Sequence, residues 1–188
     1  IYVRQNAFTN QDVVRRIEDA GGEAWNAPIS DCIVYTAHLE AWLLRERKGS
    51  LVDRISTHLK NRFFERDEAM WMRHASPLLD DRVEPPVSES LREGAAWFPM
   101  EFEGESILTV GRAIEFMKGG ASLVVNCAPF GCMPGTMAAG VFQDIERSYG
   151  VPVANMFYDG EGDLNARIGT YLANLAVKTS ARSLRKRA

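Results

Sequence analysis

The stretch from Ser122 to Tyr158 constrains the fold more than any other part of the chain. It opens with an apolar run at Ser122–Asn126, which is typical of a strand covered on both faces of a sheet. Pro134 suits the first turn of a helix, an apolar stripe follows at helical spacing, and Gly150 ends it. A second strand is predicted at Val151–Tyr158, so this segment favours a parallel pair with a right-handed crossover.

The beginning of the chain suggests a second strand–helix–strand unit. Ile1–Arg4 is a short apolar strand candidate, and Thr9 with Asp12 resembles a capping box at the start of a helix. Gly21-Gly22 ends that helix, and a further short strand is predicted at Glu23–Ala27.

The middle of the chain is predicted to be helical, and residues 31–98 are interpreted as an insertion into the α/β core. Apolar residues recur at helical steps through Asp31–Ser76, where Gly49-Ser50 divides two helices. Pro77–Pro86 is a predicted loop, and a short helix is expected at Val87–Ala95.

The α/β pattern returns with helical stripes from Ile107 to Met117 and from Leu164 to Leu175. We therefore expect a single α/β domain over residues 1–188, with a basic tail at 178–188. Its core would be a flavodoxin-like parallel sheet of about four strands in the order 2-1-3-4, with helices on both faces. Because the sequence opens with Ile1 rather than Met, we expect a fragment of a larger protein.

Composition excludes several classes of protein. The 22 Lys and Arg against 25 Asp and Glu give a net charge of 22 − 25 = −3, which argues against a general nucleic-acid binder. No apolar run approaches the roughly 18 residues of a membrane span. Three cysteines are too few for a disulfide scaffold, so a reduced, cytoplasmic setting is expected. The chain has no phosphate-loop motif, so it is not predicted to be an ATPase by itself.

The predicted strand order indicates where a ligand site would lie. Ligands of parallel sheets bind outside the carboxyl ends of the strands. Four segments follow those ends: Gln5–Phe8, Pro28–Cys32, Cys127–Gly135 and Asp159–Asn165. We expect them to line one rim, whose candidate residues besides the cysteines are Asn6, Pro129, Gly135, Asp159 and Asn165.

The pair Cys127 and Cys132 carries the strongest chemistry of this rim. The two thiols flank a Pro/Gly turn between a strand and a helix, and Cys132 stands just before the helix, where the macrodipole favours thiolate. Thiolates suit zinc or iron–sulfur clusters. The spacing alone leaves open a plainer interpretation, in which both residues are small buried hydrophobes at a tight turn.

Other polar and aromatic features admit structural interpretations. Asp159, Asp163, Asn165 and Arg167 could bind a phosphate or a partner, or they could form a turn with Asp163 as a helix N-cap. The three histidines show no metal-ligand spacing, so ordinary roles are expected for His38, His58 and His74. Three tryptophans of the middle region are expected in a core or, alternatively, on a partner-docking face: Trp42, Trp71 and Trp97.

Several motifs together resemble a known family. The clearest is N-C-A-P-F-G-C-M-P-G-T at Asn126–Thr136. Three others are A-G-G-E-A-W at Ala20–Trp25, G-R-A-I-E-F at Gly111–Phe116, and Y-D-G with N-A-R-I within Tyr158–Ile168. With them, Glu105–Leu175 resembles the C-terminal domain of the 2-hydroxyacyl-CoA dehydratase D-component family. The cysteine motif is closest to the branch in which this domain lies within large CoA-substrate-specific enzyme activases that bear a domain of unknown function.

The resemblance implies an iron–sulfur cluster held partly by Cys127, Cys132 and Cys32. Cys127 matches the family's C-x-P turn and Cys132 the activase form C-M-P-G, whereas the family's D-D-x-C-x-G pattern is absent around Cys32. The remaining ligands would come from upstream domains. The implied partners are those domains, an ATPase activase and a CoA thioester-dependent enzyme.

Three hypotheses about function follow from the sequence. The first is an iron–sulfur-associated domain of an activase or dehydratase-like protein, serving ATP-driven low-potential electron transfer. The second is a non-catalytic, flavodoxin-like interaction module with buried structural cysteines. The third is a small-ligand site at the rim without metal. Under the first hypothesis the isolated chain should show neither ATP hydrolysis nor dehydratase turnover, because the phosphate loop and the upstream ligands are missing.

Overall fold

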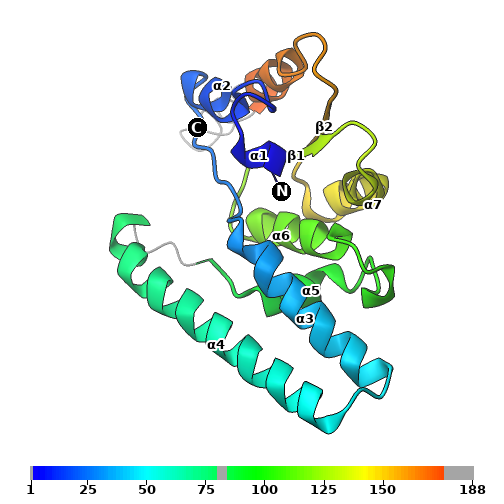
Figure 1. The fold of residues 1–188 in the computed structure, drawn as a ribbon. Coiled ribbons are helices and arrows are strands. Elements are labelled where there is room, and N and C mark those ends of the chain that lie inside the picture. The colour runs from blue at the N-terminus through cyan, green and yellow to red at the C-terminus, as the bar shows by residue number, and fades with distance from the viewer. Residues whose placement is uncertain (1, 80–83, 176–188) are drawn as a thin grey trace. The chain divides into compact units, whose positions relative to one another are not determined.

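The computed structural model describes residues 2–79 and 84–175, which form two compact units (Figure 1). The first, the sheet unit, combines Ile1–Ala27 with Phe116–Ala188. The second, the helical unit, is Pro28–Glu115. The helical region expected at residues 31–98 therefore lies within a larger unit that interrupts the sheet unit in sequence. The basic tail expected at residues 178–188 lies outside the described residues.

The sheet unit contains a parallel pair of strands. Strands β1 (Val124–Pro129) and β2 (Val153–Tyr158) pair in register from Val124 opposite Val153 to Pro129 opposite Tyr158. Helix α7 (Met133–Tyr149) connects them. The predicted parallel strand–helix–strand arrangement is thus confirmed, and Gly150 ends α7 with φ +71°, a conformation that glycine adopts without strain.

Each face of the strand pair is covered. Asn126 and Ala128 of β1 face α7. Val125 and Cys127 point the other way, as the period of two in a strand requires, and pack against a buried cluster. That cluster joins α1 (Tyr2–Gln5), α2 (Val13–Asp19), β2 and the helical residues 166–175. Its members are Val3, Val13, Ala154, Met156, Tyr158 and Ile168.

The prediction of about four strands in a flavodoxin-like order is wrong for the described residues, which contain two strands. Ile1–Arg4 was expected as a strand, but residues 2–5 form helix α1. The strand expected at Glu23–Ala27 has no ladder partner. Side chains satisfy these backbone groups instead: Gln5 Nε2 donates to the Ala27 carbonyl at 3.0 Å, and Asn26 donates to that of Arg4 at 3.1 Å.

The capping box expected from Thr9 and Asp12 is also wrong. Helix α2 begins one residue after Asp12, which adopts φ +60° and makes no capping hydrogen bond through its side chain. Asparagines replace it, because Asn10 Oδ1 accepts from the Val13 amide at 3.3 Å and Asn6 Oδ1 accepts from the Thr9 amide at 3.0 Å. Asparagine is a strong N-cap residue. Asn6 and Asn10 therefore bind the free backbone amides near the start of α2 in place of the side chains of Thr9 and Asp12.

The helical unit consists of α-helices and short 3₁₀ turns. Ser50 caps α4, since its Oγ accepts from the Val52 amide at 3.2 Å, and the predicted division at Gly49-Ser50 is confirmed. The predicted helices near Val87–Ala95 and Ile107–Met117 are confirmed as well. The elements are α3 (Ser30–Glu46), α4 (Leu51–Ala75), η1 (Ser76–Leu79), α5 (Val87–Gly94), η2 (Met100–Phe102) and α6 (Ser106–Lys118), whose last residues pass into the sheet unit.

Glycines allow α5 and α6 to cross at close range. A Cβ atom at Gly111 of α6 would lie 1.9 Å from the Ser90 carbonyl oxygen of α5. At Gly94 of α5 it would lie 2.0 Å from the Ile107 carbonyl oxygen. Only glycine permits backbones to approach this closely. Within the described ranges, no helix has the length and apolar character needed to cross a membrane.

Candidate functional site

The turn between β1 and α7 positions the second cysteine of the predicted site. Gly131 adopts φ +76°, and the Cys132 amide donates to the Pro129 carbonyl at 3.1 Å, which closes the turn tightly. Cys132 is the N-cap of α7, and its carbonyl accepts from the Thr136 amide at 3.0 Å. The residue is partly exposed, and its side chain makes no capping hydrogen bond. Cys132 therefore lies at the carboxyl end of a parallel strand, where such folds bind ligands.

The packing of α7 against β1 explains why the motif has a glycine at Gly135 and an asparagine at Asn126. A Cβ atom at Gly135 would lie 2.6 Å from Ala128 Cβ, so the first turn of α7 rests directly on the strand. Asn126 Nδ2 donates to the Gly135 carbonyl at 3.2 Å and to Asn155 Oδ1 at 2.9 Å. Asn126 thus ties helix and both strands together beside the turn. Gly135, predicted as a rim residue, acts here through close packing.

Cys127 has a different environment. Although part of the residue reaches the surface, it packs against the buried cluster of the sheet unit, and its Sγ lies 3.9 Å from the Tyr158 hydroxyl. Burial raises the pKa of the Cys127 thiol to about 11, and the hydrogen bond with Tyr158 offsets only part of that effect. The residue is therefore a protonated thiol at neutral pH. The two cysteines of the motif differ in their surroundings although only five positions separate them.

A buried hydrogen-bond chain extends from this thiol. The Tyr158 hydroxyl donates to Asn165 Oδ1 at 2.8 Å, and Asn165 Nδ2 donates to the carbonyls of Asn10 and Gln11 at 2.8 and 2.9 Å. Burial, and secondarily Cys127, raises the pKa of Tyr158. Asn165 is 2% exposed, so this predicted rim residue joins three segments of the unit rather than facing a ligand.

The other predicted rim residues make local contacts. Asn6 Nδ2 donates to the Tyr2 hydroxyl at 2.8 Å, and Asp159 Oδ1 accepts from the Glu161 amide at 2.9 Å. Pro129 is the exposed last residue of β1. Asp163 forms an exposed ion pair with Arg16 at 2.9 Å. None of these contacts gathers several polar groups around one point.

Cys32 belongs to the helical unit, in the first turn of α3. Its Sγ lies 3.8 Å from Glu105 Oε1, and the Tyr35 hydroxyl one turn later donates to the Gly104 carbonyl at 2.9 Å. Burial, together with the negative charge of Glu105, raises the pKa of Tyr35 to about 12. The Pro28–Cys32 segment expected at the rim is thus in a different unit from the other three segments.

The cysteines can be compared with what an iron–sulfur cluster requires. Such clusters take about four thiolate ligands, and the described part of the chain holds no group of three His, Cys, Asp or Glu side chains arranged for a metal. Cys132 fits the role of one ligand, because the residue is partly exposed and its side chain is not used for capping. Burial raises the pKa of the Cys127 thiol, which disfavours the thiolate that a metal binds. Cys132 is therefore the better placed candidate, and ligand roles for all three cysteines stay predictions.

A buried ion cluster in the helical unit was not predicted from the sequence. Arg112 of α6 donates to both carboxylate oxygens of Asp31 at 2.7 Å, and Asp31 is fully buried. The third nitrogen of the same guanidinium group, Arg112 Nη1, donates to Glu115 Oε2 at 2.9 Å and to the Pro85 carbonyl at 2.8 Å. Burial alone would lower the pKa of Arg112, but its bonds to Asp31 outweigh that effect and raise it. The sequence feature that could have indicated this cluster is Arg112 itself, a charged residue within the predicted helix from Ile107 to Met117.

Glu115 is the weakest member of this cluster. Ser90 Oγ donates to the same Oε2 atom at 2.9 Å, while the buried Oε1 atom has no hydrogen-bond partner among the described residues. Burial raises the pKa of Glu115, and Arg112 opposes the shift only in part. The bidentate geometry and the burial of Arg112 indicate a structural clamp joining α3, α5 and α6.

Comparison of the chain with protein-family models, with curated proteins and with solved structures gave no match.

Proposed function

We propose that this chain is an iron–sulfur-associated domain of a CoA-substrate-specific enzyme activase or a 2-hydroxyacyl-CoA dehydratase-like protein. It would serve ATP-driven low-potential electron transfer in acyl-CoA chemistry. One observation carries the proposal. The motif on which the resemblance rests, Asn126–Thr136, folds as a strand, a tight turn and a helix start, with the partly exposed Cys132 at the helix N-cap.

Each residue around Cys132 has a definable part in this function. Cys132 would ligate the cluster, which supplies one-electron transfer when bound. Asn126 and Gly135 fix the start of α7 against β1 and so hold the ligand in place. Phe130 and Met133, 75% and 59% exposed on either side of Cys132, would exclude water once the rest of the site covers them.

The other parts of the reaction belong to other domains or chains in this proposal. ATP hydrolysis requires a phosphate-binding loop, and the sequence contains no such motif. The partners would be an ATPase activase and the domains that complete the ligand set. These assignments rest on the resemblance of the sequence motifs.

The test is iron and acid-labile sulfide analysis of the natural polypeptide that contains this chain, purified without oxygen. We expect iron in the wild type and a loss of at least half of it in Cys132→Ser. Cys127→Ser tests the other predicted ligand of the same motif, and iron should fall in this variant as well if its buried thiol is a ligand. A wild type without iron, or a Cys132→Ser variant with unchanged iron, would refute the proposal.

A second candidate function is a non-catalytic interaction module, and two observations favour it. Cys127 behaves as part of the core, as structural cysteines do. Helix α4 exposes large apolar side chains, among them Leu59 and Phe63 at 62% and 61%. This candidate predicts a polypeptide that lacks iron yet binds a partner protein through the helical unit.

A further inference from the structure

Helix α4 buries two polar residues where it packs on α3, with Phe64 half-buried on the same face, and turns most of its large apolar residues outward. Towards α3 it buries Thr57 and Asn61, and Asn61 Nδ2 donates to the Ala37 carbonyl of α3 at 3.0 Å. The opposite face carries an outer stripe of five exposed apolar residues: Val52, Ile55, Leu59, Phe63 and Met70. Amphipathic helices ordinarily bury the apolar face, so this arrangement leaves the outer stripe without a covering element in the described structure.

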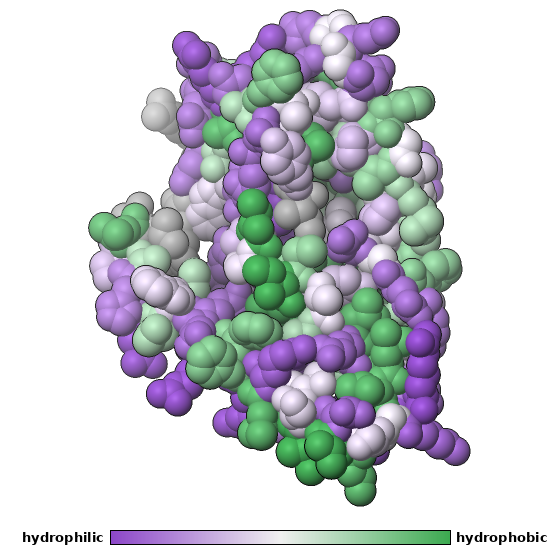
Figure 2. Space-filling view, in the orientation of Figure 1, coloured by the Kyte–Doolittle hydropathy of each residue, from purple (hydrophilic) through white to green (hydrophobic). Residues whose placement is uncertain are grey.

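The spacing of the outer stripe fits a second helix. From Val52 to Met70 there are 18 residues, which is five turns at 3.6 residues per turn, so the stripe runs parallel to the helix axis. It extends for about 27 Å at 1.5 Å per residue. A straight apolar line of this length offers the contact surface that a helix lying along α4 would use. Figure 2 shows further hydrophobic side chains at the end of the unit where α3 leads into α4.

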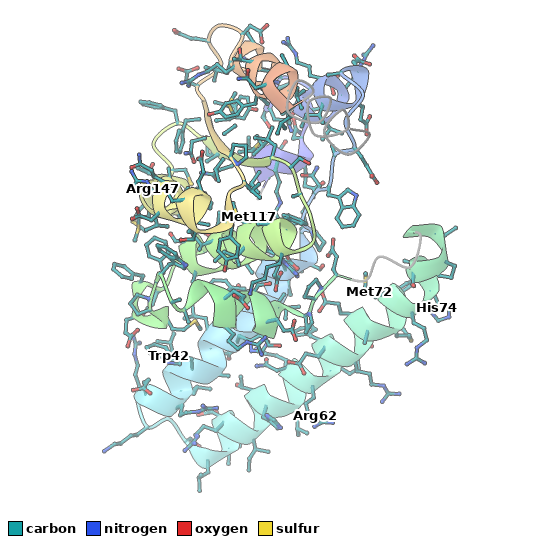
Figure 3. The ribbon with its side chains drawn as sticks, turned by 180° about the vertical axis from the view of Figure 1, so that it is seen from behind. Trp42, Arg62, Met72, His74, Met117 and Arg147 are labelled. Carbon is teal, nitrogen blue, oxygen red and sulfur yellow. The ribbon has the colours of Figure 1, made fainter. Side chains whose placement is uncertain are left out.

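The two edges of the stripe carry different charges. One edge holds the exposed arginines Arg62 and Arg73, and a third exposed arginine, Arg66, stands close to this edge within the stripe; none of the three forms an ion pair with a described residue. Figure 3 shows Arg62 on the side of α4 away from α3. The other edge holds Asp53 and Asp67, whereas its lysine, Lys60, is paired with Glu40 of α3. A ligand for this face should therefore be apolar along its centre and acidic along one edge.

We propose that the outer stripe of α4 is the docking site for an amphipathic helix of another protein segment. The bound helix has an apolar seam that covers Leu59 and Phe63 and a row of carboxylates that meets Arg62, Arg66 and Arg73. Arg66 stands in the gap of the stripe between Phe63 and Met70, so one of these carboxylates faces the middle of the interface. This assignment concerns the helical unit and is independent of the proposed iron–sulfur function.

The charges argue against two other occupants. In an antiparallel pair of α4 helices the arginine edge would face the same edge of its copy. In a parallel pair the arginine edge would meet the aspartate edge, but Arg66 would face Arg66 in the middle of the interface. An anionic lipid surface would attract the arginine edge but repel the edge with Asp53 and Asp67. A helix that sets its acidic edge against the arginines and carries no acid opposite Asp53 and Asp67 avoids like charges on both sides.

The experiment uses the 188-residue chain and two synthetic helical peptides of about 21 residues. Both carry a leucine seam; the acidic peptide has glutamates along one edge, and its matched control has lysines at the same positions. By titration calorimetry we expect the acidic peptide to bind at least tenfold more tightly than the lysine peptide. Phe63→Glu should abolish binding of both. In the double variant Arg62→Glu and Arg66→Glu the preference should reverse, with unchanged circular dichroism because these side chains are exposed.

Several results would overturn the assignment. Absence of binding by either peptide would do so, as would equal binding that the charge reversal leaves unchanged. Sedimentation of vesicles containing phosphatidylserine with the chain, lost in Phe63→Glu, would identify a lipid surface instead. Dimerisation of the chain in sedimentation equilibrium, lost in the same variant, would identify a second copy.

Discussion

Polar residues have opposite roles in two regions of the molecule, the strand pair of the sheet unit and the α3–α4 pair of the helical unit. In the sheet unit, buried asparagines such as Asn126 and Asn165 satisfy backbone carbonyls, and apolar residues cover both faces of β1. In the helical pair, Thr57 and Asn61 occupy the contact while Leu59 and Phe63 face outward. The first region covers both faces of its strand pair and leaves Phe130 and Met133 exposed at one end. The second leaves an exposed apolar stripe, which we propose a partner helix covers.

Within the helical unit the Asp31–Arg112 clamp joins α3 to α6 beside a buried apolar core. The largest effect should therefore come from Arg112→Ala, which leaves the fully buried Asp31 carboxylate without its partner. We expect a loss of about 3–5 kcal/mol in the free energy of unfolding, measured by urea denaturation. The control Arg62→Ala alters an exposed arginine and should change stability by less than about 0.5 kcal/mol.

A double variant distinguishes a buried charge from a simple loss of packing. Arg112→Met combined with Asp31→Asn removes both charges, and it should be clearly more stable than Arg112→Ala. Equal destabilisation in the two variants would contradict the role assigned to the ion pair.

In the sheet unit the next largest effect should come from close packing of α7 on β1. Gly135→Ala puts a methyl group 2.6 Å from Ala128 Cβ, and we expect a loss of about 1–3 kcal/mol in the free energy of unfolding. The matched control is Gly140→Ala in the same helix, where a Cβ atom meets nothing within 4 Å. That control should gain about 0.5–1 kcal/mol from helix propensity. Similar changes in the free energy of unfolding for the two variants would show that the first turn of α7 does not pack closely on β1.

The pH dependence of stability should report the weakest member of the clamp. Because the pKa of Glu115 is raised in the folded state, the folded chain holds this proton more tightly than the unfolded chain. The contribution of Glu115 to the free energy of unfolding therefore falls as pH rises from its ordinary pKa of 4.5 to its higher pKa in the folded state. Above the folded-state pKa this contribution is constant. Glu115→Gln removes this dependence, so its stability relative to wild type should increase over that interval in urea titrations. Parallel pH profiles of the two proteins would contradict the raised pKa.

The sequence identified the helical pair and the parallel strand pair but not what their faces contact. Spacing of three and four residues located α4 and its division at Gly49-Ser50, because helix formation is a local property. The same spacing cannot tell which face meets α3, since that depends on polar partners such as Asn61 and the Ala37 carbonyl. The strand expected at Ile1–Arg4 failed for a similar reason, because four residues leave the choice between helix and strand to their neighbours.

The candidate site shows the same limit at finer scale. The turn, the proline and the helix start around Cys132 follow from local residue preferences, and the predicted helix boundary is confirmed. Cys127 lies in a strand, where alternate residues face opposite sides. The core lies on the side where β1 meets Val3, Val13 and Ile168. Val3 and Val13 are more than a hundred positions from Cys127 in the sequence, and Ile168 is about forty positions away, so local preferences do not reveal this side.

The smallest effect on stability, and the sharpest comparison of the two cysteines, should come from alkylation. At pH 8 a thiol whose pKa is about 11 is thiolate in roughly one molecule in a thousand, so Cys127 should react slowly with iodoacetamide. Cys132 is partly exposed and makes no capping hydrogen bond, so mass spectrometry should find it labelled before Cys127. Labelling at Cys132 should leave the urea midpoint unchanged, and in Cys132→Ala the peptide with this motif should show no fast labelling. Faster labelling of Cys127 would place its thiol at the edge of the sheet and restore it as a ligand candidate equal to Cys132.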